Sequence, residues 1–198
     1  MMSEMKKRLQ RKGARRGFTL VELLIVIIII GILAGAMMLV AGTSRDSAEA
    51  SRIISDLRNV KAATLMWMAE NPTGYSKTDW TKLQSDPSPL NKYLDRPLDK
   101  NTMRFTFEVG TIIISWKGSD ATADRDKPEE KVEAWFLGYD LAASAGKYGA
   151  VRSGVKKNLA QQAKSAGLYG KTELNMAESE DKLGYFKEND SKIYVIVQ

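Results

Sequence analysis

The chain has 198 residues, no cysteine, no histidine and a formal net charge of +6. This length fits one globular domain with an extension. The two missing residue types exclude disulfides, Cys/His zinc sites, cysteine nucleophiles and catalytic triads that need an imidazole.

The excess positive charge belongs to the N-terminus. Residues 1–17 contain seven basic side chains and one acidic side chain, Glu4, whereas the remaining residues carry equal numbers of acids and bases. The charge therefore gives no indication of nucleic-acid binding. Basic residues before an apolar segment predict that the N-terminus stays in the cytoplasm while the chain after Ala41 is exported.

An apolar run follows the basic residues. Leu23 to Ala41 are 19 consecutive positions without a charged or polar side chain. As a helix they would extend ~28 Å, which is sufficient for a hydrocarbon core of about 30 Å. A secretory signal peptide cleaved near the small residues Ala34–Ala36, or a plain signal anchor, would fit this run. Neither interpretation explains Glu22 or the Gly17–Phe18 junction.

The stretch GFTLVELLIVIIIIGILAGA, Gly17 to Ala36, resembles the N-terminus of type IV prepilins and of the pseudopilins of type II secretion. The shared pattern is a basic leader, a glycine, a phenylalanine, the letters TLVELL and a long apolar helix. The resemblance implies that a prepilin peptidase cuts after Gly17. Phe18 would then become the new N-terminus, and its amine would be methylated.

Glu22 is an acid at the edge of the apolar run, where burial of a charge costs on the order of 3 kcal/mol on insertion scales. After cleavage, the amine of Phe18 on an incoming subunit could pair with Glu22 of a neighbour and neutralise both charges. The resemblance supports this assembly role. Two alternatives remain open: the dipole of the helix favours an acid in its first turn, and Glu22 could contact the amine of its own chain.

Gly31 and Gly35 have small-xxx-small spacing within the same run. This spacing allows helix backbones to approach closely in lipid or in a packed filament core. Glycine is also frequent in transmembrane helices, so the spacing fits helix packing and ordinary composition equally well.

The helical pattern continues from Asp46 to Glu70 and forms an apolar stripe expected to cover a core, ending at Asn71-Pro72 and Gly74. The stripe comprises Ala50, Ile53, Leu57, Val60, Thr64 and Trp67. Gly42 and Thr43 mark a joint between the two halves. Two short helices are then expected, Asp79–Gln84 capped by Thr78 and Pro89–Leu94 capped by Ser88.

Three strands are predicted next: Met103–Gly110, Thr111–Trp116 after a turn at Gly110, and Lys131–Tyr139. They would form an antiparallel meander. The intervening loop contains several acids but lacks the spaced ligand pattern of a calcium site, so no metal is expected. These acids are Asp120, Asp124, Asp126, Glu129 and Glu130.

The last third of the chain is predicted to contain a polar helix within Val151–Gly167, closed by Gly167. A C-terminal hairpin should follow, with Tyr185 and Phe186 before a turn at Glu188–Ser191 and a strand at Lys192–Val197. Hydrogen bonds and packing must hold this tail, because the chain has no cysteine for a disulfide.

The predicted fold class is α+β, a type IV pilin fold in which a long N-terminal helix packs on an antiparallel sheet. Residues 1–17 would be a removed leader and 18–41 a membrane and assembly helix. Residues 42–71 would be the amphipathic half of that helix, 72–102 a variable loop, and 103–198 the sheet with its C-terminal helix and hairpin.

The resemblance implies a structural subunit of a type IV pilus-like filament and not an enzyme, with no cofactor. Its partners would be other copies in a helical homopolymer, the prepilin peptidase, an assembly ATPase and platform, minor pilins and the membrane. The mature chain of 181 residues favours a pilus. A major pseudopilin of type II secretion and a membrane-tethered binding module are the alternatives. The subunit would occupy the inner membrane, with its head outside, before it joins an extracellular pilus or a periplasmic pseudopilus.

Overall fold

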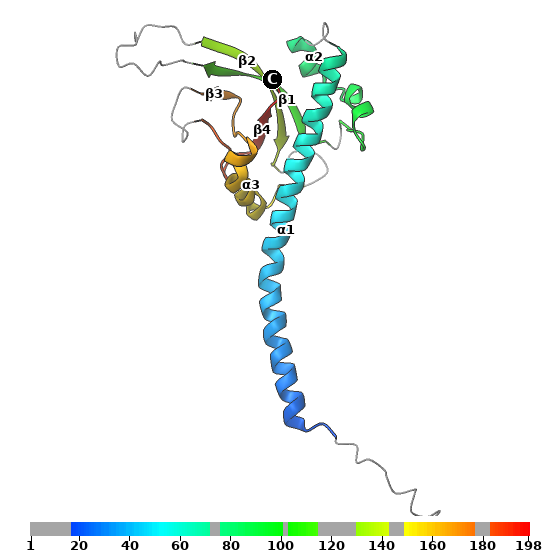
Figure 1. The fold of residues 1–198 in the computed structure, drawn as a ribbon, viewed down its shortest axis with the longest axis vertical. Coiled ribbons are helices and arrows are strands. Elements are labelled where there is room, and N and C mark those ends of the chain that lie inside the picture. Colours follow the sequence, from blue (N-terminus) through cyan, green and yellow to red (C-terminus); the bar gives the residue numbers. More distant parts are fainter. Residues whose placement is uncertain (1–16, 72–75, 101–102, 115–129, 143–148, 177–182) are drawn as a thin grey trace, which may run out of the picture. The chain divides into compact units, whose positions relative to one another are not determined.

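The computed structural model describes residues 17–71, 76–100, 103–114, 130–142, 149–176 and 183–198. The chain divides between Gly42 and Thr43 into two compact units. The second unit combines helices with a four-stranded sheet, which confirms the α+β class (Figure 1). The leader residues 1–16 and the acids from Asp120 to Glu129 lie outside the described residues.

Helix α1, Leu20–Glu70, runs without interruption through Gly42. Its second half carries the expected stripe: Ala50, Leu57 and Thr64 are fully buried, whereas Trp67 is half-buried. The helix ends as predicted, since Asn71 donates hydrogen bonds from its backbone and its side chain to the carbonyl of Trp67, at 3.1 and 2.8 Å. A proline follows in the sequence and cannot continue the helix.

The sheet contains β1 (Phe105–Ile114), β2 (Glu130–Asp140), β3 (Glu173–Asn175) and β4 (Lys192–Ile196) in the order β3-β1-β2-β4. The β1/β2 and β2/β4 pairs are antiparallel. Strand β3 pairs with β1 in parallel, so the sheet is mixed and the expectation of a wholly antiparallel sheet was wrong. The sequence reasoning missed β3 because three residues are too few to show a period.

The predicted turn at Gly110 was also wrong, because β1 passes straight through this residue. The glycine instead permits a close approach of two chains: a Cβ atom there would lie 2.0 Å from the carbonyl oxygen of Thr172 and 2.6 Å from the ring of Phe136. That carbonyl accepts a hydrogen bond of 2.9 Å from the amide of Thr111. The missing side chain of Gly110 therefore leaves room for the segment that leads into β3.

The expected C-terminal hairpin does not form. Strand β4 pairs with β2, whereas Tyr185 makes an isolated bridge with Tyr169. The amides and carbonyls of Tyr169 and Tyr194 exchange two hydrogen bonds, of 2.8 and 2.7 Å. The free edge of β4 is thus partly covered by the segment after α3. Long-range pairing of this kind cannot be read from local turn residues.

Both short helices exist, with different caps from those predicted. Helix α2, Lys77–Lys82, is capped by Ser76 in a reciprocal capping box with Asp79. The second, Ser88–Tyr93, is a 3-10 helix preceded by Pro87, which makes no side-chain cap. Ser88 instead donates its amide to Asp86, at 3.1 Å.

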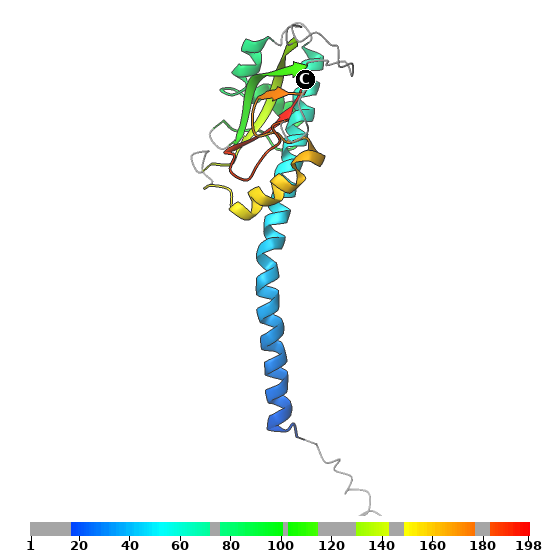
Figure 2. The same cartoon turned by 90° about the vertical axis from the view of Figure 1, so that its left-hand side faces the viewer.

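Helix α3, Ser153–Ala166, lies within the predicted range, and Gly167 ends it in the left-handed conformation with φ 66°. The start of α3 lies against α1. Arg152 contacts Asp46 and Glu49 with distances of 3.1 and 2.8 Å from its Nη2 atom. Figure 2 shows α3 alongside the lower part of the sheet.

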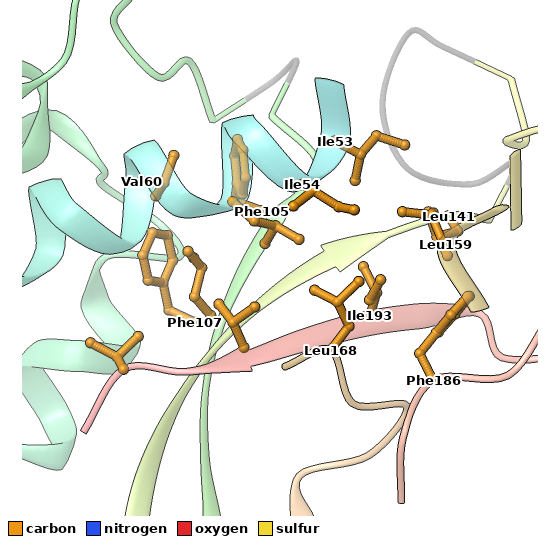
Figure 3. Packing of buried hydrophobic residues seen from close by; sticks show 14 of the residues in the cluster. Ile53, Ile54, Val60, Phe105, Phe107, Leu141, Leu159, Leu168, Phe186 and Ile193 are labelled. Carbon is orange, nitrogen blue, oxygen red and sulfur yellow. The ribbon is translucent and has the colours of Figure 1, made fainter. Parts of the chain in front are cut away.

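The main core lies between α1 and one face of the sheet. Ile53, Ile54 and Val60 of α1 belong to the same buried cluster as Phe105 and Phe107 of β1 (Figure 3). Trp80 of α2 is fully buried, donates its indole N–H to the carbonyl of Glu108 at 3.0 Å, and packs edge-on against Phe107 and Trp135. A smaller cluster occupies the opposite face of the sheet and contains Ala134, Phe136, Leu174 and Tyr194.

Candidate functional site: the N-terminus of helix α1

The predicted cleavage junction lies immediately before α1. Residues 17–19 have no regular secondary structure, and α1 begins at Leu20. Phe18 is 91% exposed, and no atom lies within 4 Å of a Cβ built on Gly17. A peptidase needs access to the backbone that it cuts, so the exposure of Phe18 is compatible with cleavage between these residues.

Thr19 and Glu22 form a capping box at the start of α1. The Oε2 atom of Glu22 accepts hydrogen bonds from the amide and the hydroxyl of Thr19, at 2.8 and 2.9 Å. The amide of Glu22 donates to the hydroxyl oxygen of Thr19 at 3.2 Å. Such reciprocal bonds satisfy backbone donors that a helix start otherwise leaves open. The sequence already contains the signal, Thr-x-x-Glu, which the sequence analysis did not use.

The capping box fixes where the carboxylate of Glu22 lies. Its Oε2 atom is bonded to the amide of Thr19, and Phe18 is the residue just before that amide. Consecutive Cα atoms lie ~3.8 Å apart. A new amine on Phe18 would therefore be one residue away from the Thr19 amide, which already donates to Glu22. This position suits a contact within the chain as well as a contact with another copy. The structure leaves both alternatives open.

Gly31 and Gly35 lie one turn apart on α1, and no atom lies within 4 Å of a Cβ built on either residue. The side chains around them are exposed as well: every described side chain from Phe18 to Met38 is exposed. The helix contains a segment that is long and apolar enough to cross a membrane, with a mean hydropathy of 3.2. Packing at the two glycines remains a prediction.

Three comparisons bear on this segment. The family model for the prokaryotic N-terminal methylation motif matches residues 12–38. The N-terminus is of the prepilin type. The chain is also 34% identical over 61 residues to type II secretion system core protein G of Klebsiella michiganensis. That match covers 31% of this chain and 43% of the relative. No solved structure matches the chain significantly.

The prepilin-type segment contains all five residues singled out by the sequence. Gly17, Phe18, Glu22, Gly31 and Gly35 all lie within the matched residues 12–38. In the structure Glu22 is hydrogen-bonded to Thr19, whereas nothing lies within 4 Å of a Cβ built on Gly31 or Gly35. Among the described residues, no group of three acids could hold a metal ion; the acidic loop examined for calcium lies largely outside them.

The second unit contains a polar cluster that the sequence analysis missed. Glu108 of β1 accepts hydrogen bonds from Lys192 at 2.8 Å and from the hydroxyl of Tyr194 at 3.1 Å. Side chains of β1 and β4 meet over β2 because Gly138, between these two strands, has no side chain; a Cβ there would be 2.7 Å from the ring of Tyr194. Burial and the neighbouring carboxylate of Glu108 raise the pKa of Tyr194. The cluster joins β1 to β4 and has a structural role.

Proposed function

We propose that the chain is a structural subunit of a pilin-like filament and not an enzyme. A prepilin peptidase would remove the leader before Phe18, and the apolar segment from Phe18 to Ala41 would anchor the subunit in the inner membrane. The same helix would then pack against other copies during polymerisation. The prepilin-type segment at residues 12–38 is the observation that carries this proposal.

The exposure of the first half of α1 supports assembly through that half. Ile25, Ile28 and Leu33 are 49%, 51% and 56% exposed, and no described side chain of this segment is buried. A continuous apolar surface of this length requires lipid or another apolar surface around it. A membrane before assembly and a bundle of equivalent helices afterwards would satisfy the requirement in turn.

Two filament types fit this proposal. A subunit of a type IV pilus is one of them. A pseudopilin of a type II secretion system is favoured by the relative from Klebsiella michiganensis, whose printed name places it in such a system. Mechanical shearing of cells separates the two: long surface filaments containing this chain support a pilus, and retention in the periplasm supports a pseudopilus.

Glu22 would pair its charge with the amine of Phe18 on a neighbouring copy. The capping box allows a sharp test, because Glu22→Gln retains a side-chain acceptor for Thr19 but removes the charge. Glu22→Ala removes both. We expect both variants to be processed normally and to give far fewer filaments than the wild type, measured by electron microscopy and by the sheared fraction.

The control is the comparison between those two variants. If Glu22→Gln assembles normally and Glu22→Ala does not, the acid acts by capping α1 and the charge pair is wrong. Normal filaments in both variants would show that assembly does not depend on Glu22.

A further inference from the structure

Two hollows lie on opposite flanks of α1 within the unit Thr43–Gln198. The first, of about 280 Å³, is lined by Arg58 and Lys61 of α1 together with Tyr169 and Ile196. The second, of about 360 Å³, is lined by Asp56 of α1 and by Asp95 and Leu98 from the segment after the 3-10 helix. Positions 56 and 58 point about 200° apart on a helix, so the two hollows open on different flanks of α1.

The first hollow is basic. Within the part of the chain that the structure describes, neither Arg58 nor Lys61 forms an ion pair with an acid. Helix α3 also ends here, at Gly167. Two cations that form no ion pair among the described residues can meet carboxylates presented by another protein surface. We call Arg58, Lys61, Tyr169 and Ile196 the basic hollow.

The second hollow has exposed acids on its rim. Asp95 is exposed and forms no ion pair among the described residues, whereas Asp56 contacts Arg52 at 3.6 Å in a solvent-exposed pair. Such pairs contribute little and exchange partners easily. Arg96 also lies on this rim, beside the two carboxylates. We assign recognition to Asp56 and Asp95, and the charge reversals described below test this assignment. We call Asp56, Asp95 and Leu98 the acidic rim.

We propose that the basic hollow of one copy receives the acidic rim of the next copy. The inference rests on the proposed function. The two surfaces are different patches of the same chain, and contacts between different patches produce open helical arrays when the rotation does not close. Arg58 and Lys61 would face Asp56 and Asp95, while Ile196 and Leu98 supply apolar contact. Complementary charges of this kind fix the register between partners more than they add affinity.

Cysteine cross-linking tests the contact directly, because the chain contains no cysteine of its own. In the full-length protein, Arg58→Cys and Asp95→Cys are combined, and cells are treated with a short bis-maleimide, whose reach exceeds that of a disulfide. The doubly substituted chain should give a ladder of multimers on a denaturing gel. A mixture of the two single variants should stop at dimers, and each single variant alone should give none.

The matched control combines Arg58→Cys with Glu188→Cys, an exposed acid outside both hollows. A ladder from this control equal to that of the test pair would overturn the proposal, since proximity would then be unspecific. Dimers from Arg58→Cys alone would also overturn it, because they indicate a symmetric contact. Filaments that form from the doubly substituted chain without a ladder would contradict this contact while leaving the proposed function intact.

Charge reversal gives a second readout that does not depend on cross-linker geometry. Arg58→Asp should lower the filament yield about tenfold, because like charges would then oppose each other across the contact. Lys157→Asp makes the same reversal of charge at an exposed position of α3 and should leave the filament yield unchanged. Combining Arg58→Asp with Asp95→Arg should restore filaments. Failure of this restoration, with both variants processed normally, would overturn the pairing.

If the wild-type chain is neither processed nor assembled, the proposed function fails and this inference fails with it. Binding of anionic lipid vesicles that is lost in Arg58→Asp, together with unchanged filaments, would assign the basic hollow to a lipid headgroup and not to a second copy.

Discussion

The two units of the chain differ in whether their apolar side chains are exposed or buried within the chain. From Phe18 to Met38 the described side chains are exposed without exception, and Leu20 is 80% exposed. From Thr43 onward the chain buries its own core, with Leu57, Phe136 and Ile193 at 0% exposure. The second unit therefore satisfies its apolar surface within one chain, whereas the first must find lipid or other copies.

The family model covers part of the first unit: the methylation motif matches residues 12–38, which include most of the exposed apolar half of α1. The second unit needs a core of suitable volume and pattern, which many sequences can supply.

The largest effect should come from opening a cavity in the second unit. Leu57→Ala removes a fully buried side chain, and such changes cost about 2–5 kcal/mol in the free energy of unfolding. Leu65→Ala on the same helix changes a side chain that is 42% exposed and should stay within about 0.5 kcal/mol. Thermal unfolding of the full chain in detergent, followed by near-UV circular dichroism, measures both.

Thermal unfolding of Ile28→Ala tests the same comparison between the units with a substitution in the first unit. Ile28 is 51% exposed and has no core around it in the single chain, so the unfolding temperature should not change. A loss comparable to that of Leu57→Ala would show that the first unit is packed within the chain, contrary to this account.

A smaller effect is expected from glycine substitutions in the two units. Gly110→Ala places a Cβ 2.0 Å from the backbone oxygen of Thr172, and overpacking of this kind costs about 1–3 kcal/mol. Gly35→Ala meets no atom within 4 Å and should leave the unfolding temperature unchanged. If Gly35 packs against other copies, filament yield alone should fall. Equal destabilisation by both substitutions would contradict the division between the units.

The smallest effect concerns a local cap in the second unit. Hydrogen bonds from the hydroxyl and amide of Ser76, with a further bond from Lys82, lower the pKa of Asp79 to about 2. Because the folded pKa is depressed, the stabilisation is present above the unfolded value of about 3.9 and is lost as the pH falls toward 2. Asp79→Asn should therefore lower the unfolding temperature slightly at pH 7 and match the wild type near pH 2. A constant difference across that range would exclude the charge as the cause.

The sequence predicted those features that depend on local pattern. The apolar stripe of α1 and its end at Asn71 follow from helical spacing, and Gly167 was placed correctly as a helix end. The position of β3 and the role of Gly110 could not be predicted, because both depend on Thr172, which lies 62 residues after Gly110 in the chain. The strand partner of β4 was missed for the same reason.

At the candidate site, the motif residues were evident from the sequence, whereas the capping box between Thr19 and Glu22 emerged from the structure. It gives Glu22 a role in starting α1 that the charge pattern alone did not show. The two roles are compatible, since the carboxylate that caps α1 accepts a hydrogen bond from the residue after Phe18, which the proposed cleavage would make the N-terminus.

The most direct measurement is the intact mass of the protein extracted from membranes, with sequencing of its N-terminus. The account predicts a chain that starts at Phe18 and carries one additional methyl group on its amine, in place of the unprocessed chain of 198 residues. A chain that still begins at Met1, or one that begins after Ala36, would contradict it.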